Sequence, residues 1–385
     1  MILIKNATIH TMANKNFENG MILVDHGKII AIGNVVTLPP NTEIIDAKGK
    51  FVMPGMIDAH CHLGMWEDGM GSEGADGNEA VDPVTPHLRA IDAINPMDIC
   101  FKDAMDAGIT TVATGPGSAN VIGGQFAVIK TYGNRIDDMI INKCLAMKVA
   151  FGENPKRVYY AQKKSPSTRM GTAAILRENL FKAKMYIEKQ NKAKENPDKI
   201  PEFDIKMEAL AKVIKKEIPI KVHAHRADDI LTALRIAKEF NIDITLDHCT
   251  EGHLIVDYLK EGIQKGIILG PSLSNRSKVE LKNLTFKTPG ILSKAGIKVA
   301  IMTDHPVIPL QYLPVCAGIA AREGMDEEEA LKAITINAAE ILGIEDKLGS
   351  LEIGKDADIV IYSGHPFDLR SKVDLVMVSG KIVKS

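Results

Sequence analysis

The sequence predicts an α/β fold, a (β/α)8 TIM barrel with a small β-sandwich module formed by both chain termini. Three features favour this fold. Both ends of the chain have strand patterns without convincing helices, the long middle alternates strand and helix patterns, and histidine or aspartate follows several middle strands. The 385 residues suit one barrel of about 250 residues and a modest second module.

Short apolar or β-branched runs at the two ends predict strands. They lie at residues 1–4, 7–12, 21–24 and 29–32, and at 357–362, 375–378 and 381–383. Because chain ends often lie close together, we expect both ends to share one module. The expected domains are therefore residues 1–53 and 347–385 as the two parts of the β-sandwich module, and residues 54–346 as the barrel.

The middle of the chain predicts eight strands. They are expected at residues 56–59, 109–113, 126–131, 145–151, 218–222, 242–246, 267–269 and 298–302. Helix patterns lie between many of them, as at residues 96–107 and 227–240. Strands that alternate with helices indicate a parallel sheet with crossover connections.

Composition excludes several classes of protein. A net charge of −2 does not match the basic surface of a nucleic-acid binder. No apolar run approaches the roughly 18–20 residues of a membrane span, and we see no signal-peptide pattern at the N-terminus. The five cysteines are scattered and odd in number, which indicates a reduced, cytoplasmic setting.

Two long loops follow predicted strands. Residues 63–86 are rich in glycine and carry six acidic residues without lysine or arginine, whereas residues 152–170 are basic. Such loops are either simply solvated or cover the active site of a barrel enzyme.

Histidine and aspartate at strand ends predict a metal site. His60 and His62 alternate along one strand, so both side chains point to the same side. His223, His248 and Asp304 follow three further predicted strands. Barrel enzymes place their chemistry at these strand ends, and imidazoles with a carboxylate suit a divalent ion such as Zn²⁺ with an open position for water.

These residues stand in motifs that resemble the amidohydrolase superfamily. The motifs are PGMIDAHCH at residues 54–62, KVHAH at 221–225, DHC at 247–249 and TDH at 303–305, in the order of that superfamily. The segments TINAA at 335–339 and GKDAD at 354–358 resemble its return to the β-module. Within the superfamily the chain is most similar to the imidazolonepropionase and prolidase-like branch.

The resemblance implies metal ligands. His60, His62, His223 and Asp304 would bind the metal, and Asp304 would also act as general base. His248 would bind a second metal or contact the water or substrate. A second ion would require a bridging group, for which Lys148 as a carboxylated lysine is the first candidate and Lys130 and Glu153 are alternatives. One or two ions stay open; Zn is the favoured metal, with Mn, Fe or Co also compatible.

Substrate contacts are predicted nearby. His225 and His305 lie next to expected ligands, and Arg276 could pair with a substrate carboxylate, since arginine binds that group in bidentate fashion. Arg169 and Tyr159 are weaker candidates.

The predicted function is metal-dependent hydrolysis of a C–N amide bond in a cyclic amide, a dipeptide or an N-acyl amino acid. Deamination of an aminated heterocycle is the alternative, although His225 and Arg226 stand where deaminases of the superfamily carry a glutamate. A non-catalytic scaffold is the third hypothesis. We expect a small-molecule substrate, no nucleic-acid or membrane partner, and a homo-oligomer.

Overall fold

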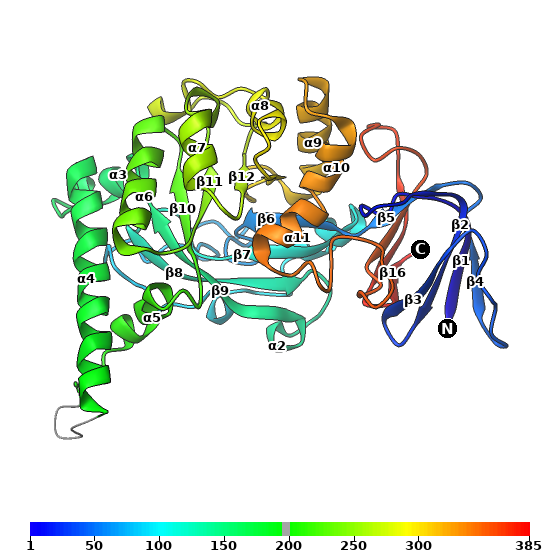
Figure 1. Ribbon diagram of the computed structural model, residues 1–385, viewed down its shortest axis with the longest axis horizontal. Coiled ribbons are helices and arrows are strands. Elements are labelled where there is room, and N and C mark those ends of the chain that lie inside the picture. The colour runs from blue at the N-terminus through cyan, green and yellow to red at the C-terminus, as the bar shows by residue number, and fades with distance from the viewer. Residues whose placement is uncertain (195–200) are drawn as a thin grey trace.

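The structure is a computed structural model that describes residues 1–194 and 201–385. Its strands form two eight-stranded sheets. Figure 1 shows one of them as a barrel with helices packed around it, and the other as a separate sheet made from both ends of the chain. No helix among the described residues has the length and apolar character needed to cross a membrane.

The barrel sheet follows chain order from β6 to β13. Its strands are β6 (Met56–Cys61), β7 (Ile109–Thr114), β8 (Ile122–Lys130), β9 (Ile140–Ala150), β10 (Ile220–Ala224), β11 (Ile244–His248), β12 (Ile267–Leu269) and β13 (Val299–Ile301). β6 pairs with β7 in parallel, and β9 to β13 form parallel pairs. The predicted eight-stranded α/β barrel is confirmed.

The prediction of an entirely parallel sheet is wrong at β8. This strand is antiparallel to both β7 and β9. Residues 115–121 alone connect β7 to β8, and residues 131–139, with the short α2 (Ile136–Met139), connect β8 to β9. Parallel neighbours need a crossover of about a dozen or more residues. The two connections are too short for that, so the chain reverses at each of them.

Helices cover the outside of the barrel. Figure 1 shows α6 to α11 along the side formed by β10 to β13, and the long α4 at one edge. The helices are α1 (Ile99–Asp106), α3 (Glu153–Ala161), α4 (Arg169–Ala193), α5 (Ile205–Ile214), α6 (Ala227–Phe240), α7 (Val256–Gly262), α8 (Thr288–Lys294), α9 (Leu313–Arg322), α10 (Glu327–Ala333) and α11 (Ile336–Leu342). Single-turn helices are η1 (Ala90–Asp92), η3 (Gly252–Leu254), η4 (Val279–Leu281) and η5 (Leu310–Tyr312).

The segment at residues 152–170 is not the simple loop that the sequence predicts. It contains α3, which begins directly after Gly152, a residue with a φ of 81°. Pro155 lies in the first turn of this helix, where a missing backbone N–H does no harm. Gly152 and Pro155 therefore mark the start of a helix inside the segment that the sequence predicts as a loop.

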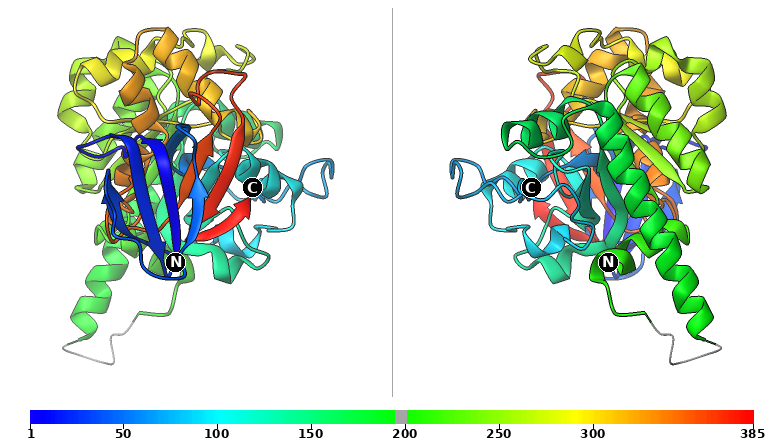
Figure 2. Two further views of the ribbon diagram at one scale, coloured as in Figure 1. Left: turned by 90° about the vertical axis from the view of Figure 1, so that its right-hand side faces the viewer. Right: turned by 90° about the vertical axis from the view of Figure 1, so that its left-hand side faces the viewer.

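The second sheet unites the two ends of the chain. Its strands are β1 (Ile2–Ile9), β2 (Phe17–Asp25), β3 (Lys28–Gly33), β4 (Glu43–Asp46), β5 (Phe51–Pro54), β14 (Ile359–Tyr362), β15 (Val373–Val378) and β16 (Lys381–Lys384). β5 pairs with β14, which joins the N-terminal strands to the C-terminal ones. Figure 2 shows the two groups side by side. Apolar side chains such as Ile4, Val52 and Ile359 form a core of its own.

An ion pair connects this sheet to the barrel. Lys130, at the end of β8, lies 2.7 Å from Asp358, which precedes β14. Their side chains are 11% and 3% exposed. Asp358 also accepts a hydrogen bond from the backbone N–H of Ser379 at 2.8 Å. Lys130 therefore stabilises the contact between the two sheets and lies away from the predicted metal site.

Replacing Lys130 should destabilise the protein. Lys130→Met leaves the carboxylate of Asp358 buried without its cation, so we expect the free energy of unfolding to fall by about 3–5 kcal/mol, measured by urea titration. The control is Lys102→Met, which removes an exposed pair with Asp106 on α1 and should change stability little. Equal, small losses in both variants would contradict a structural role for the buried pair.

Candidate active site

The predicted ligands meet at one end of the barrel. His60 lies on β6, Lys148 on β9, His223 on β10 and His248 at the end of β11. Asp304 follows β13, with a φ of 57°. All of these side chains are buried. Parallel strands deliver their carboxyl ends to the same mouth of a barrel, which is why residues far apart in sequence converge here.

Hydrogen bonds connect β6 to the segment that follows β13, and we call this connection the seam. It sets the distances between the predicted metal ligands. Thr303 donates hydrogen bonds to the Asp58 carboxylate from its backbone N–H at 2.9 Å and its hydroxyl at 2.7 Å. The backbone N–H of His62 donates to the carbonyl of His305 at 2.8 Å. As a result, Asp304 Oδ1 lies 3.4 Å from Nε2 of His60 and 3.3 Å from Nε2 of His62.

Hydrogen bonds at the far side of the rings fix which nitrogen carries the proton. His62 Nδ1 lies 2.6 Å from the carbonyl of Gly115, and His248 Nδ1 lies 3.0 Å from that of Gly270. A carbonyl oxygen can only accept, so each Nδ1 donates, and each neutral ring keeps a lone pair on Nε2. Metal-binding histidines in proteins are commonly oriented in this way.

His60 is held by a buried carboxylate instead. Its Nδ1 lies 2.9 Å from Asp247, whose other oxygen accepts a hydrogen bond from Lys221 at 3.0 Å. Burial alone would raise the pKa of Asp247, but the charges of Lys221 and His60 outweigh it and lower the pKa to about 2. Asp247 therefore stays ionised and favours the proton of His60 on Nδ1.

Sequence reasoning gave Asp247 and Lys221 no role, although both stand inside the motifs. The sequence feature that could have indicated Lys221 is its spacing from His223, because residues i and i+2 lie on one face of a buried strand. Asp247 and His248 are adjacent, and both serve the site because His248 has a φ of 72°. This left-handed backbone turns two consecutive side chains toward the same cluster.

Lys148, which the sequence suggested as a bridging ligand, lies next to His60. Its Nζ is 3.3 Å from Nε2 of His60, and the side chain is fully buried. Burial lowers its pKa to about 8, so a substantial part of the amine is neutral near physiological pH. Lys130, the competing candidate, instead pairs with Asp358 at the contact between the two sheets.

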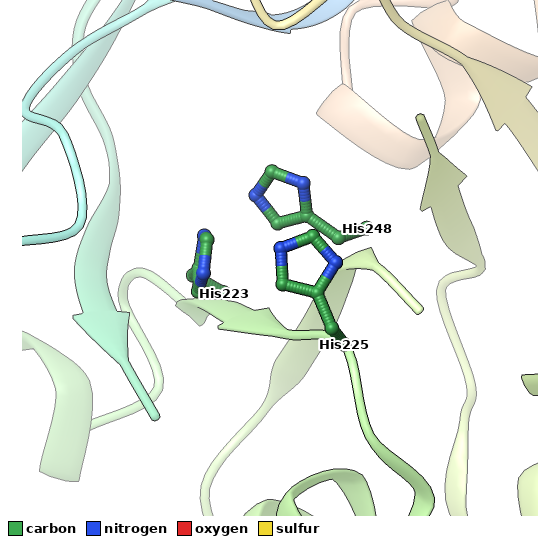
Figure 3. A group of neighbouring side chains, drawn as sticks. All are labelled: His223, His225 and His248. Carbon is green, nitrogen blue, oxygen red and sulfur yellow. The ribbon is translucent and has the colours of Figure 1, made fainter. Parts of the chain in front are cut away.

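His225 joins His223 and His248 in a second cluster. Figure 3 shows the three rings, with one nitrogen of His225 facing the other two side chains. The ring centroids lie 4.1 to 4.8 Å apart. The ligand atoms of these histidines are close enough to hold one metal ion, as are those of His60, His248 and Asp304. Burial lowers the pKa of His223 and His248 well below the usual value, so both rings are neutral and able to bind metal.

A cavity of about 530 Å³ opens over these clusters. Its walls come mainly from the loops that follow the barrel strands, which is where barrel enzymes place their active sites. Trp66 and Asn78 belong to the glycine-rich loop at residues 63–86. The other lining residues are His62, Gly117, Ser118, Asn154, His223, His225, Pro271, Ser274, Asn275, Ser277, Lys278, Leu281, Asp304, Pro306 and Val307.

The structure does not bring every predicted substrate contact to this cavity. Arg276 is not among the lining residues, and its guanidinium donates to the carbonyl of Leu284 at 2.7 Å. Arg169 pairs with Asp229 at 3.0 Å, and the Tyr159 hydroxyl donates to the carbonyl of Asp82. His305 is buried beside Asp304 behind the wall. The cation that does line the cavity is Lys278, which sequence reasoning did not single out.

Comparison with known proteins agrees with the site described above. Residues 51–383 match the Amidohydrolase family. The chain belongs to this family. A solved amidohydrolase from Thermotoga maritima has a TM-score of 0.96 and 46% identity, with 100% of this chain and 99% of that chain covered.

Among curated relatives, the imidazolonepropionase of Fusobacterium nucleatum is 24% identical over 90% of this chain and 85% of its own length. The amidohydrolase tasK of Hapsidospora irregularis is 28% identical over 94% of this chain, but the match spans only 39% of tasK. A solved prolidase shares the fold at 17% identity, with 100% of this chain and 99% of that chain covered and a TM-score of 0.61. The predicted similarity to imidazolonepropionase and prolidase-like members is confirmed. A 5'-deoxyadenosine deaminase of Methanobrevibacter smithii is also similar, at 22% identity over 94% of this chain and 83% of that protein.

Asp247→Asn should weaken metal binding by about 10–100-fold, because the amide orients His60 less firmly than the carboxylate does. Zn²⁺ affinity would be measured by competition with a chromogenic chelator. Asp243→Asn is the matched control, since Asp243 lies just before the opposite end of β11. Equal affinity in the two variants would show that Asp247 does not support the site.

Proposed function

We propose that this protein is a metal-dependent hydrolase that cleaves a C–N amide bond in a small molecule. The substrate is a cyclic amide, a dipeptide or an N-acyl amino acid. Its family contains hydrolases acting on such bonds, which supports the general class. The observation that carries the proposal is that Asp304 Oδ1 lies 3.4 Å from Nε2 of His60 and 3.3 Å from Nε2 of His62, with His62 and Asp304 lining the cavity.

This cluster suits a cation. With Nδ1 protonated on both rings, the two Nε2 atoms and the Asp304 oxygen all present lone pairs to one another. Burial lowers the pKa of His60, so a doubly protonated ring there is disfavoured. His60, His62 and Asp304 would hold one divalent ion, and His223 and His248 would help to hold a second ion beside it. Nitrogen and carboxylate ligands of this kind suit Zn²⁺, and also Mn, Fe or Co.

Side chains of the protein carry out the proton transfers and hold the metal. When bound, the metal supplies Lewis-acid chemistry, which polarises a carbonyl group and makes water more acidic. Asp304 lies at the cavity wall and accepts the proton of the attacking water. It then returns that proton to the leaving nitrogen. His248 keeps an Nε2 without a partner among the described residues, which fits a metal ligand better than a proton donor.

Lys148 is the proposed bridge between two ions. A neutral lysine amine can add CO2 and lose a proton to give a carbamate, which would supply two oxygen ligands. The fully buried position and the pKa of about 8 favour the neutral amine that this addition requires. The side chain already lies 3.3 Å from His60.

Lys148→Ala should therefore reduce the metal content from two ions per chain to one or none. Elemental analysis measures this after saturation with Zn²⁺ and gel filtration. Lys143→Ala changes an exposed lysine of the same strand and should keep the wild-type content. One ion per chain in the wild type and in both variants would exclude the two-ion arrangement.

Deamination remains the second candidate because a deaminase is among the relatives. The residues after His223 weigh against it. His225 turns into the histidine cluster, and Arg226 pairs with Asp228 at 2.8 Å. Neither is a carboxylate able to carry a proton to a leaving ammonia.

Elemental analysis combined with a substrate screen tests the proposed function. We expect bound Zn, Mn, Fe or Co in the wild type and its loss in His60→Ala, whereas His10→Ala, in the terminal sheet, should keep it. The screen would use cyclic amides, dipeptides and N-acyl amino acids, with ammonia release from aminated heterocycles measured in parallel. Absence of metal after reconstitution would refute the proposal, and ammonia release alone would establish the deaminase instead.

A further inference from the structure

Lys278 stands out among the residues around the cavity. It follows β12 in the loop before η4, and it is the one lysine or arginine among the lining residues that the structure describes. Its side chain is 24% exposed. An ammonium group carries three N–H donors, yet within the described part of the chain none of them makes a side-chain hydrogen bond. The donors are therefore available to a molecule in the cavity.

Within residues 1–194 and 201–385, the ionic partner of Lys278 is Glu280, which lies too far away for a hydrogen bond. Glu280 Oε1 lies 3.7 Å from Lys278 Nζ and 3.8 Å from His225 Nε2. Its other oxygen accepts a hydrogen bond from the backbone N–H of Glu153 at 2.9 Å. Glu280 is buried, so it cannot move outward to meet the lysine. A ligand anion would come closer to Lys278 than this carboxylate does.

The neighbouring side chains add neutral donors and an apolar wall. Ser277 and Asn275 line the cavity next to Lys278. Trp66 and Val307 also line it and provide apolar surface. A partly buried cation with hydroxyl and amide groups beside it is a favourable site for a carboxylate, because hydrogen bonds to ionised groups are stronger than neutral ones.

We propose that Lys278 is the carboxylate-binding residue of the active site, so that the substrate is an amide that also carries a free carboxylate and an apolar group. This inference rests on the proposed function and narrows its class of substrates. It selects N-acyl amino acids, dipeptides and acidic cyclic amides over neutral amides. Lys278 takes the role that the sequence suggested for Arg276, whose guanidinium donates to the Leu284 carbonyl.

The protein contains a reporter for this site. Trp66 is its only tryptophan, it lines the cavity, and its ring centroid is 4.9 Å from that of His62. Binding in the cavity should therefore change the tryptophan fluorescence. The probes are N-acetyl-L-leucine and N-acetyl-L-leucinamide, which differ only in carboxylate against carboxamide, titrated into zinc-loaded and metal-free protein. Inorganic phosphate is the third probe.

We expect the wild type to bind N-acetyl-L-leucine about tenfold more tightly than its amide, as one charged hydrogen bond provides. Lys278→Met should lose this preference in both metal states. Lys282→Met, the same change at an exposed residue of the same segment, should keep it. The zinc content of all three proteins should be equal, since Lys278 is not one of the proposed metal ligands.

The following results of these titrations would overturn the proposal. They are equal binding of the two probes by the wild type, binding of neither probe at millimolar concentration, an unchanged preference in Lys278→Met, and loss of the preference in Arg276→Met. Tighter binding of phosphate than of N-acetyl-L-leucine would assign the subsite to a phosphate group and also contradict it. A carboxylate preference without any hydrolysis would refute the proposed function alone, and hydrolysis without a carboxylate preference would refute this inference alone.

Discussion

A buried carboxylate joins the first and last strands of the barrel. Asp58, on β6, accepts hydrogen bonds from the backbone and hydroxyl of Thr303 and from the backbone N–H of His60. The described strands form no ladder between β6 and β13, so these bonds and the contact of His62 with His305 close the seam. Burial raises the pKa of Asp58 to about 7, which shows that the hydrogen bonds offset only part of the desolvation. Every distance from Asp304 to His60 and His62 depends on this seam.

The interior below the seam is unusually polar for a barrel. Lys148 and Lys221 lie opposite each other on β9 and β10, and both lie over the ring of Phe126. Asp247 offsets their charge and faces His60. A buried charge is tolerated only where a partner is present. Lys221, Asp247 and His60 therefore form a buried charged group beneath the cavity, which His62, His223, His225 and Asp304 line.

Much of the barrel and of the candidate site could be predicted from the sequence, because the patterns that indicate them lie within short segments of the chain. Alternation along a strand places His60 and His62 together, and it places Lys221 and His223 on one face. The order of strand ends then brings His223, His248 and Asp304 to one mouth of the barrel. The reversed direction of β8 also had a local cause, the short connections at residues 115–121 and 131–139, which the strand and helix patterns alone did not reveal.

The remaining wrong or missing predictions concern side-chain contacts and orientations that only the folded chain determines. The contact of Asp247 with His60 joins β11 to β6, and no periodicity along either strand shows it. Arg276 and Lys278 stand two residues apart in an irregular loop, where no fixed period determines which side chain faces the cavity. The basic segment at residues 152–170 was predicted to be a loop, whereas Gly152 and Pro155 mark the start of α3 within it.

The central claim is that the seam assembles a metal centre from His60, His62, His223, His248 and Asp304. Crystallographic diffraction recorded on both sides of the zinc absorption edge, from crystals grown with Zn²⁺, tests it most directly. We expect anomalous peaks for two zinc ions, both enclosed by these five side chains. A map without such a peak, or with zinc bound only elsewhere on the protein, would contradict it.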